Sequence, residues 1–200
     1  VNVAVGRIVA LRGSVNRGIT GLGSIVSKGG VLYNINPNTE PVWKAEVDSN
    51  GGTGRAVTEG LMVRMTDRIR ANGGKTTVIL TDDGTYRAYW SLLSQLRSFV
   101  NTQDFSGGFK GLAFQAGDQE IPIVSDYDAP RGTMHFLNEK DLTFYRDKDL
   151  HWLDRDGSVL KQKVDANGRY DIWEAHMLER HELGAHRRNT HGKITDLISG

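Results

Sequence analysis

Residues 73–97, GGKTTVILTDDGTYRAYWSLLSQLR, predict the end of one helix, a buried strand and a second helix. The glycine pair at 73–74 supplies a helix stop, and the β-branched run 76–80 has the length of a short strand. Residues 81–84, Thr-Asp-Asp-Gly, carry side chains that cap a helix N-terminus. In the helix that follows, apolar residues recur at spacings of three and four and therefore share one face: Tyr86, Tyr89, Trp90, Leu93 and Leu96.

A first helix enters this region from the N-terminal side. Its apolar residues lie at helical spacing and predict one buried stripe: Val57, Leu61, Met62, Met65 and Ile69. A helix, a strand and a helix in succession form one packed α/β layer, so we expect the rest of the chain to dock on it.

The composition is that of a globular chain with nearly balanced charge. Its 200 residues suit one large domain or two small ones, and a formal net charge of +1 gives no overall field that favours nucleic acid. The sequence has no cysteine, which excludes disulfides, a thiol nucleophile and cysteine-ligated zinc and favours a cytosolic origin. No apolar run approaches the ~20 residues that span a bilayer, and no signal-peptide pattern is present. Because the sequence begins at Val1, we expect a processed form or a fragment.

The N-terminal fifty residues give weak local signals. Residues 1–11 fit either a strand or the tail of a helix. Residues 33–41, YNINPNTEP, are expected to be irregular because each proline disfavours helix in the residue before it. Trp43 follows directly and is expected to anchor this loop to the core.

The C-terminal half predicts mainly strands. Residues 101–108 have the composition of a polar loop, and short strands are expected at 109–114, 120–124, 133–137, 142–145 and 193–198. Asn138 can cap a short turn over 139–142. The Asn-Gly pair at 167–168 predicts a hairpin over 158–178, with a helix over 172–183 as the alternative.

Two motifs resemble ligand-binding loops without meeting their geometry. Residues 73–76, Gly-Gly-Lys-Thr, suggest a phosphate loop, but that loop needs strand, loop and helix in this order, whereas here a helix precedes and a strand follows. Asp154, Asp156 and Gly157 resemble a calcium loop, but the glycine comes too early for that loop. A helix end and a tight turn explain the two motifs better.

The histidines form the most regular pattern of chemically active residues. They recur every five residues at His176, His181, His186 and His191. This spacing makes them diverge on a helix and alternate between the faces of a strand, which favours surface or interface histidines. The alternative hypothesis is a metal-dependent hydrolase in which these histidines bind metal with nearby acids, namely Asp171, Glu174, Glu179 or Glu182.

A small basic cluster allows another hypothesis. Arg187, Arg188 and Lys193 could contact phosphate in a nucleic-acid-binding module, although such a cluster is more often a solvated face or a set of salt-bridge partners. No nucleophile, base and orienting group stand together in the sequence. The residues therefore predict a mixed α/β domain with no catalytic residue, no cofactor and no metal site.

Several segments, in their shared order, resemble the major capsid proteins of tailed bacteriophages. They begin with GLGSIV (21–26), GGVLYNINPNTEPVWKAEV (29–47) and the long run 51–93, and they continue with 99–145, LDRDGSV (153–159) and LGAHRRNTHGKI (183–194). The run typical of that family, IPIV.D..AP..TM.FLN, is found here at residues 121–138. The resemblance covers nearly everything from Gly21 onward and corresponds to the C-terminal two-thirds of such a subunit.

The resemblance implies an α+β (mixed α/β) fold, which the phage major capsid proteins share with encapsulins. It implies a peripheral-domain segment and linker at residues 1–50 and an axial domain with a mixed sheet and flanking helices at 51–137. It also implies a return to the peripheral domain at 138–200, with the long hairpin and the final strand. Family members usually carry an N-terminal arm, an extended loop and a long helix before the GL segment, where this chain has only 20 residues.

The function implied by the resemblance is structural rather than enzymatic. Such a subunit assembles with itself into the pentamers and hexamers of an icosahedral head, which encloses double-stranded DNA that it contacts without reading bases. Its other partners would be portal, scaffold or decoration proteins, and no membrane is involved. Its location would be the virion, after synthesis in the host bacterial cytoplasm. An encapsulin-type compartment shell, which would bind a cargo peptide, is the alternative within the same fold.

Overall fold

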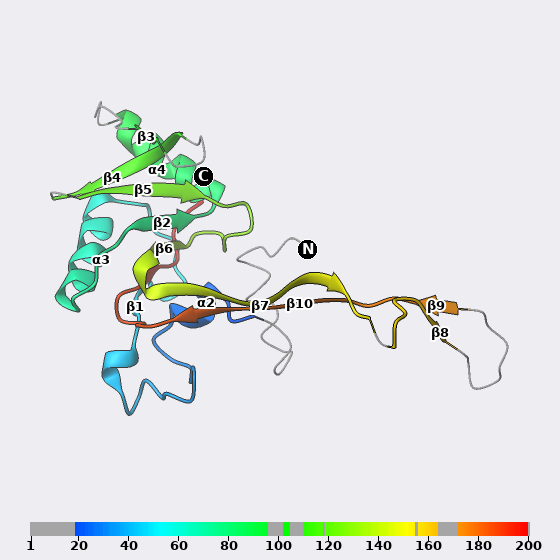
Figure 1. The fold of residues 1–200 in the computed structure, drawn as a ribbon. Coiled ribbons are helices and arrows are strands. Elements are labelled where there is room, and N and C mark those ends of the chain that lie inside the picture. Colours follow the sequence, from blue (N-terminus) through cyan, green and yellow to red (C-terminus); the bar gives the residue numbers. More distant parts are fainter. Residues whose placement is uncertain are drawn as a thin grey trace. The chain divides into compact units, whose positions relative to one another are not determined.

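The computed structural model describes residues 19–95, 102–104, 110–117, 119–154, 156–163 and 172–199 (Figure 1). The chain divides into two compact units, which we describe separately. The sheet unit consists of Val1–Thr143 and Ala185–Gly200, and the ribbon unit consists of Phe144–Gly184.

A seven-stranded mixed sheet organises the sheet unit. Its strands, in spatial order, are β1 (Glu46–Asp48), β11 (Gly192–Ile194), β6 (Met134–Leu137), β2 (Val78–Thr81), β5 (Gln119–Ser125), β4 (Lys110–Ala116) and β3 (Thr102–Asp104). The pairs β1–β11 and β2–β5 are parallel, and the other four pairs are antiparallel. The sheet therefore joins residues from all three segments of the domain division that the resemblance implies.

Helix α3 (Glu59–Ala71) forms where the sequence predicts the first helix. Thr58 caps its N-terminus, because the side-chain oxygen accepts a hydrogen bond from the backbone N–H of Leu61. Gly73, with φ of +73°, ends the helix as expected. The buried side of the helix is Met62, Met65, Thr66 and Ile69.

Helix α4 (Asp83–Gln95) directly follows β2. Its cap is Asp82, whose carboxylate accepts hydrogen bonds from the backbone N–H groups of Gly84 and Thr85 at 3.1 and 3.2 Å. Tyr89 is buried as predicted, but Trp90 is about half exposed (49%). The buried face predicted for this helix was too wide. Positions 86, 89 and 93 already span the side of the helix that one sheet can cover, so Trp90 lies at its edge. Leu96 lies outside the described residues.

One apolar cluster joins both helices to the sheet. Ile79 of β2 lies opposite Ile123 of β5 and Phe136 of β6, and all three are fully buried. They belong to the same cluster as Met65 of α3 and Tyr89 of α4, so both helices cover the same face of the sheet. This arrangement confirms the predicted mixed α+β fold.

The opposite face of the sheet carries a polar residue at its centre. His135 of β6 is flanked in register by Leu80 of β2 and Lys193 of β11. The imidazole is buried, and its Nδ1 has no hydrogen-bond partner among the residues that the structure describes. Burial, together with the nearby positive charge of Lys193, lowers the pKa of His135 to about 4.

Three short helical segments complete the sheet unit. They are α2 (Leu22–Ile25), η2 (Pro41–Trp43) and η3 (Glu139–Asp141). Asn138 caps η3 through its side-chain oxygen, as predicted. The ring of Trp43 lies 6.2 Å from that of Tyr33, so the tryptophan packs against the loop that it follows.

The ribbon unit is built from two pairs of strands. Strands β7 (Leu142–Trp152) and β10 (Met177–Ala185) form one two-stranded sheet, and β8 (Lys161–Lys163) and β9 (Ile172–Glu174) form another (Figure 1). The pairing of β8 with β9 is antiparallel and confirms a hairpin around the Asn-Gly turn. The turn itself, residues 165–168, lies outside the part of the chain that the structure describes.

Two predictions of local structure were wrong. Part of the expected polar loop at 101–108 is strand β3, which is stabilised by pairing with β4 rather than by its own sequence. The alternative helix over 172–183 is not formed, because β9 pairs with its hairpin neighbour β8 and β10 pairs with β7, which is distant in sequence. The strand expected at 142–145 is longer than predicted and is β7 (Leu142–Trp152). The strand expected at 193–198 is shorter and is β11 (Gly192–Ile194). The prediction for residues 1–11 lies outside the described residues.

The described helices include none that is long and apolar enough to cross a bilayer.

Candidate functional site

The histidine metal site of the alternative hypothesis is not assembled in the part of the chain that the structure describes. Within the sheet unit, His191 is buried, and its Nδ1 accepts the backbone N–H of Asn138 at 3.2 Å. The Nε2 of His186 instead lies 2.8 Å from the hydroxyl of Thr143. Burial lowers the pKa of His191 to about 4, against an opposing effect of Asp141.

The other two histidines belong to the ribbon unit. His176 pairs with Glu174 at 3.4 Å, and His181 lies 3.2 Å from Glu179. The described residues contain no group of three or more histidine, aspartate or glutamate side chains that could hold a metal ion. Asp171 is outside the described residues, and Glu182 has a partner elsewhere.

The basic cluster is also divided between different roles. Arg188 is completely buried, contrary to the expectation of a solvated face. Its guanidinium donates to backbone carbonyl oxygens at the end of α2 and directly after it, at 2.8 Å to Ile25, 3.0 Å to Ser24 and 2.9 Å to Ser27. Burial lowers the pKa of Arg188. The neighbouring Arg187 donates to the carbonyl of Asn72, and Lys193 lies in the sheet beside His135.

The loop 127–131 and the start of α4 line a polar hollow of about 460 Å³. Asp82, its buried acid, already accepts hydrogen bonds from the hydroxyls of Thr85 and Ser199 and from the N–H of Gly132. Burial raises the pKa of Asp82, but these bonds outweigh it and hold the pKa below its usual value. Asp82 is therefore a capping residue and not a free general base.

The ribbon unit exposes most of the large apolar side chains that are accessible on the described residues. Eight of the fifteen exposed large apolar residues lie in this unit: Phe144, Tyr145, Leu150, Trp152, Val159, Leu160, Trp173 and Met177. An isolated two-stranded sheet is marginally stable in water, and accessible aromatic residues are typical of interaction surfaces. We therefore take the ribbon, rather than a pocket, as the candidate functional site.

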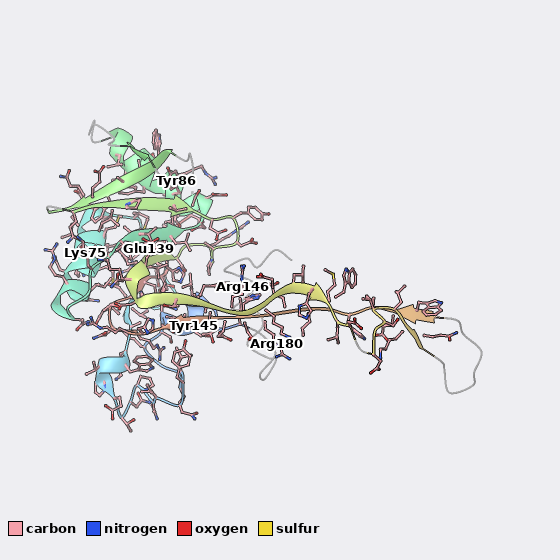
Figure 2. The ribbon with its side chains drawn as sticks, in the orientation of Figure 1. Lys75, Tyr86, Glu139, Tyr145, Arg146 and Arg180 are labelled. Carbon is pink, nitrogen blue, oxygen red and sulfur yellow. The ribbon has the colours of Figure 1, made fainter. Side chains whose placement is uncertain are left out.

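The β7–β10 ribbon carries charged side chains on both strands. Backbone hydrogen bonds join Asp141 to His186 and Leu153 to His176, so the strands run antiparallel. Between these bonds β7 has eleven residues and β10 only nine, so β7 contains two extra residues and its side chains do not alternate without a break. Figure 2 shows Arg146 on one side of the ribbon, with Tyr145 and Arg180 on the other.

Several contacts join side chains of the ribbon. The rings of Phe144 and His181 lie 5.2 Å apart, and Arg146 stands 5.7 Å from the centre of the Phe144 ring. Asp147 and Arg180 pair at 3.6 Å. Arg146 also pairs with Asp149 at 2.9 Å, and both side chains stay more than half exposed.

Sequence reasoning did not find this surface. It predicted only a short strand at 142–145 and did not pair it with residues near 180. The available signal was the alternation of charges in FYRDKDLHW, which is typical of a strand with two solvated faces.

Solved structures identify the fold. The chain is similar to a chain of the capsid asymmetric unit of cyanophage A-1(L), with a TM-score of 0.60 and 21% identity over 90% of this chain. The chain has the fold of a phage capsid subunit. The capsid fold is shared by the SrpI encapsulin of Synechococcus elongatus PCC 7942, which matches 84% of this chain with a TM-score of 0.51 and 10% identity.

The match to the capsid fold covers only part of those proteins. This chain spans 59% of the cyanophage capsid chain and 56% of the encapsulin chain. No protein-family model matches the sequence, and neither does any curated protein. The similarity therefore concerns the fold, which is the one expected from the ordered sequence segments.

Proposed function

We propose that this chain is a structural subunit of a closed protein shell, and specifically of the head of a bacteriophage. The observation that carries the proposal is the capsid fold, which extends over nine-tenths of the chain in the comparison with the cyanophage capsid. In this proposal the subunit has no catalytic role. It assembles with itself into pentamers and hexamers that together enclose double-stranded DNA.

The surface of the chain supports a role in self-association. A shell subunit needs complementary surfaces on several edges. The ribbon unit presents apolar side chains on both faces, and the sheet unit exposes others on its loops, including Val42 at 74% and Tyr127 at 89%. By contrast, Asp82, His135 and His191 of the sheet unit are buried. Among the described residues they do not form a cluster that could hold a metal ion.

The proposal includes the partners and the location implied by the resemblance. The DNA would be contacted weakly by each copy and without sequence specificity, since the net charge is only +1. Portal, scaffold or decoration proteins would complete the head, and the assembled protein would be found in the virion after synthesis in the host bacterial cytoplasm. We also retain the axial domain at 51–137 and the peripheral segments at 1–50 and 138–200 as part of this proposal.

An encapsulin-type compartment shell is the second candidate, and the similarity to the SrpI encapsulin favours it. The two candidates share self-assembly and differ in contents. Particles from the source organism would contain double-stranded DNA in the first case and a packaged protein in the second, so nuclease digestion and mass spectrometry of the contents separate them.

The first experiment is negative-stain electron microscopy of the purified chain, combined with its mass by light scattering. We expect rings, shells or tubes built from repeating capsomers, with a mass that is a multiple of the 22.1 kDa subunit. A protein that remains monomeric at all accessible concentrations would contradict the proposal. Metal analysis of the same untagged sample tests the hydrolase alternative, which predicts stoichiometric metal.

A further inference from the structure

The sequence contains three Asn-Gly pairs, at residues 50–51, 72–73 and 167–168. In such a pair the asparagine can react with its own chain, because glycine has no side chain to shield the backbone nitrogen that lies beside the carboxamide. The structure describes the first two pairs, and their surroundings differ. The third pair lies outside the described residues.

The pair at 72–73 is held in place by other segments. The Nδ2 of Asn72 donates to a carboxylate oxygen of Glu46 at 3.1 Å and to the carbonyl of Asn189 at 3.5 Å. The backbone N–H of Gly73 donates to the carbonyl of Arg70 at 2.9 Å, at the end of α3. The two reacting groups can therefore meet only when this end of the helix opens.

The pair at 50–51 lies in an exposed loop after β1. The Nδ2 of Asn50 donates to the carbonyl of Thr53 at 2.8 Å, and the backbone N–H of Gly51 donates to the hydroxyl of Ser49 at 3.2 Å. All residues from 49 to 53 are exposed. In the described part of the chain, the hydrogen bonds of both reacting groups thus stay within the loop, and no helix or strand has to open before they meet.

The hydroxyl that accepts the Gly51 N–H is itself bound to a carboxylate. Ser49 donates its proton to the Oδ2 of Asp196 at 2.7 Å. Hydrogen bonds from Ser49 and from the N–H groups of Gly52 and Asn50 hold the pKa of Asp196 below its usual value, so this side chain is ionised at neutral pH. The N–H, the hydroxyl and the carboxylate form a chain along which a proton can leave the Gly51 nitrogen.

We propose that Asn50–Gly51 is a site of spontaneous deamidation, which Ser49 and Asp196 promote. The Gly51 nitrogen forms a bond to Cγ of Asn50 while its proton passes through Ser49 to Asp196. The bond between Cγ and Nδ2 then breaks, and Nδ2 leaves as ammonia after taking up that proton. Water opens the resulting succinimide at either carbonyl and leaves aspartate or isoaspartate at position 50. The overall reaction consumes one water molecule and requires no cofactor.

The product changes the contact between this loop and the segment after β11. Asp196 ties the loop through Ser49, Asn50 and Gly52, and the modification places a second carboxylate beside it. The two negative charges repel, and isoaspartate also lengthens the backbone by one carbon, so we expect the tie to weaken. The inference goes beyond the proposed function and does not depend on it.

Peptide mapping of the full chain tests the site. The purified protein is incubated at neutral pH and then digested with pepsin in acid, which stops the reaction, and mass spectrometry measures the replacement of NH2 by OH at each asparagine. We expect Asn50 to convert at least about tenfold faster than Asn72 and to give both products, aspartate and isoaspartate. Equal rates at the two sites, or faster conversion of Asn72, would overturn the proposal.

Three variants test the part played by the proton relay. Ser49→Ala removes the hydroxyl, and Asp196→Asn keeps an acceptor oxygen but removes the charge, so we expect conversion of Asn50 to slow by about tenfold or more in each. Ser49→Thr keeps the hydroxyl and should keep the wild-type rate. Faster conversion in Ser49→Ala would show that these bonds protect the asparagine and would overturn the role of the relay. An unchanged rate at Asn72 in the same samples serves as the control that each variant is folded.

Discussion

At the scale of single residues, Arg188 has the most unusual environment. It is a fully buried cation whose guanidinium is surrounded by backbone carbonyl oxygens of residues 24–30 rather than by a carboxylate. A planar guanidinium with five N–H donors suits this arrangement, because it satisfies several carbonyl groups that would otherwise be buried without partners. The sequence could not predict it, because Arg188 stands beside exposed His186 and Arg187 in a polar run.

Replacing this arginine should destabilise the protein strongly. We expect Arg188→Gln to lower the free energy of unfolding by about 3 kcal/mol or more, because several buried carbonyl groups lose their donor. Arg187→Gln removes the same side chain from an exposed neighbour and should cost less than about 1 kcal/mol. Urea unfolding followed by circular dichroism measures both. Equal losses in the two variants would contradict the role of Arg188.

The two buried histidines make stability depend on pH. His135 and His191 have pKa values of about 4 in the folded chain, below the value of about 6.5 expected when unfolded. The unfolded chain therefore binds protons first as the pH falls, so the stability that is present above pH 6.5 is lost toward pH 4. Near pH 5.5 we expect a slope of about 2.4 kcal/mol per pH unit from the pair.

This slope is measurable by urea unfolding between pH 7 and 5, above the range in which most carboxylates titrate. His135→Gln removes one titrating group and should reduce the slope by about half. A wild-type stability that does not change across this interval would show that the folded chain takes up these protons as readily as the unfolded chain, and would contradict the lowered pKa values.

At the scale of elements, the sequence predicted best where the signals are local. The stop at Gly73, the β-branched run and the cap at Asp82 each lie within a few residues of the element that they define, and α3, β2 and α4 all formed as expected. The pairing of β7 with β10 depends instead on residues about thirty positions apart. Most residues of β7 are exposed, so this strand lacks the apolar alternation of a half-buried strand.

Gly132 marks a close approach between the segment before β6 and the segment after β11. It lies just before β6, with φ of +66°, and its carbonyl accepts the N–H of Leu197 at 2.9 Å. A Cβ atom at this position would collide with the carbonyl oxygen of Leu197. Gly117 has the same φ, but a Cβ atom there would meet only open space.

These two glycines form a matched pair for mutagenesis. Gly117→Ala should cost about 1 kcal/mol, the penalty of a left-handed backbone for a residue with a side chain. Gly132→Ala should cost at least about 2 kcal/mol more, since the backbone near Leu197 must move. Thermal unfolding compares the two. Similar melting temperatures would mean that the contact with Leu197 yields easily.

At the scale of the whole molecule, assembly should change the surroundings of the ribbon tryptophans. Trp152 and Trp173 are 52% and 58% exposed. If the ribbon is buried between copies, the emission of a variant that keeps only Trp152 should shift to the blue as the protein concentration rises. A variant that keeps only Trp90, on α4 of the sheet unit, provides the comparison. Identical emission before and after assembly would argue against burial of the ribbon.

The fold class was predictable as a whole because the ordered segments resemble one family, and the structural comparisons agree. The candidate surface was not. A surface for self-association is not marked by particular catalytic or metal-binding residue types. Its apolar and charged residues resemble those of an ordinary solvated strand. The histidines and arginines looked more like a functional site because they are close in sequence. In the fold they contact different segments and do not form one cluster among the described residues.

The position of β11 in the sheet has a consequence for how the protein is made. It lies between β1 and β6, so β1 pairs with nothing else in the described sheet. Residues 46–48 leave the ribosome early, yet they must wait for residues 192–194 before their hydrogen bonds can form. A nascent chain therefore cannot complete its central sheet before residues 192–194 are synthesised. A chain whose translation stops earlier would leave β1 unpaired and could not join a growing particle as a finished subunit.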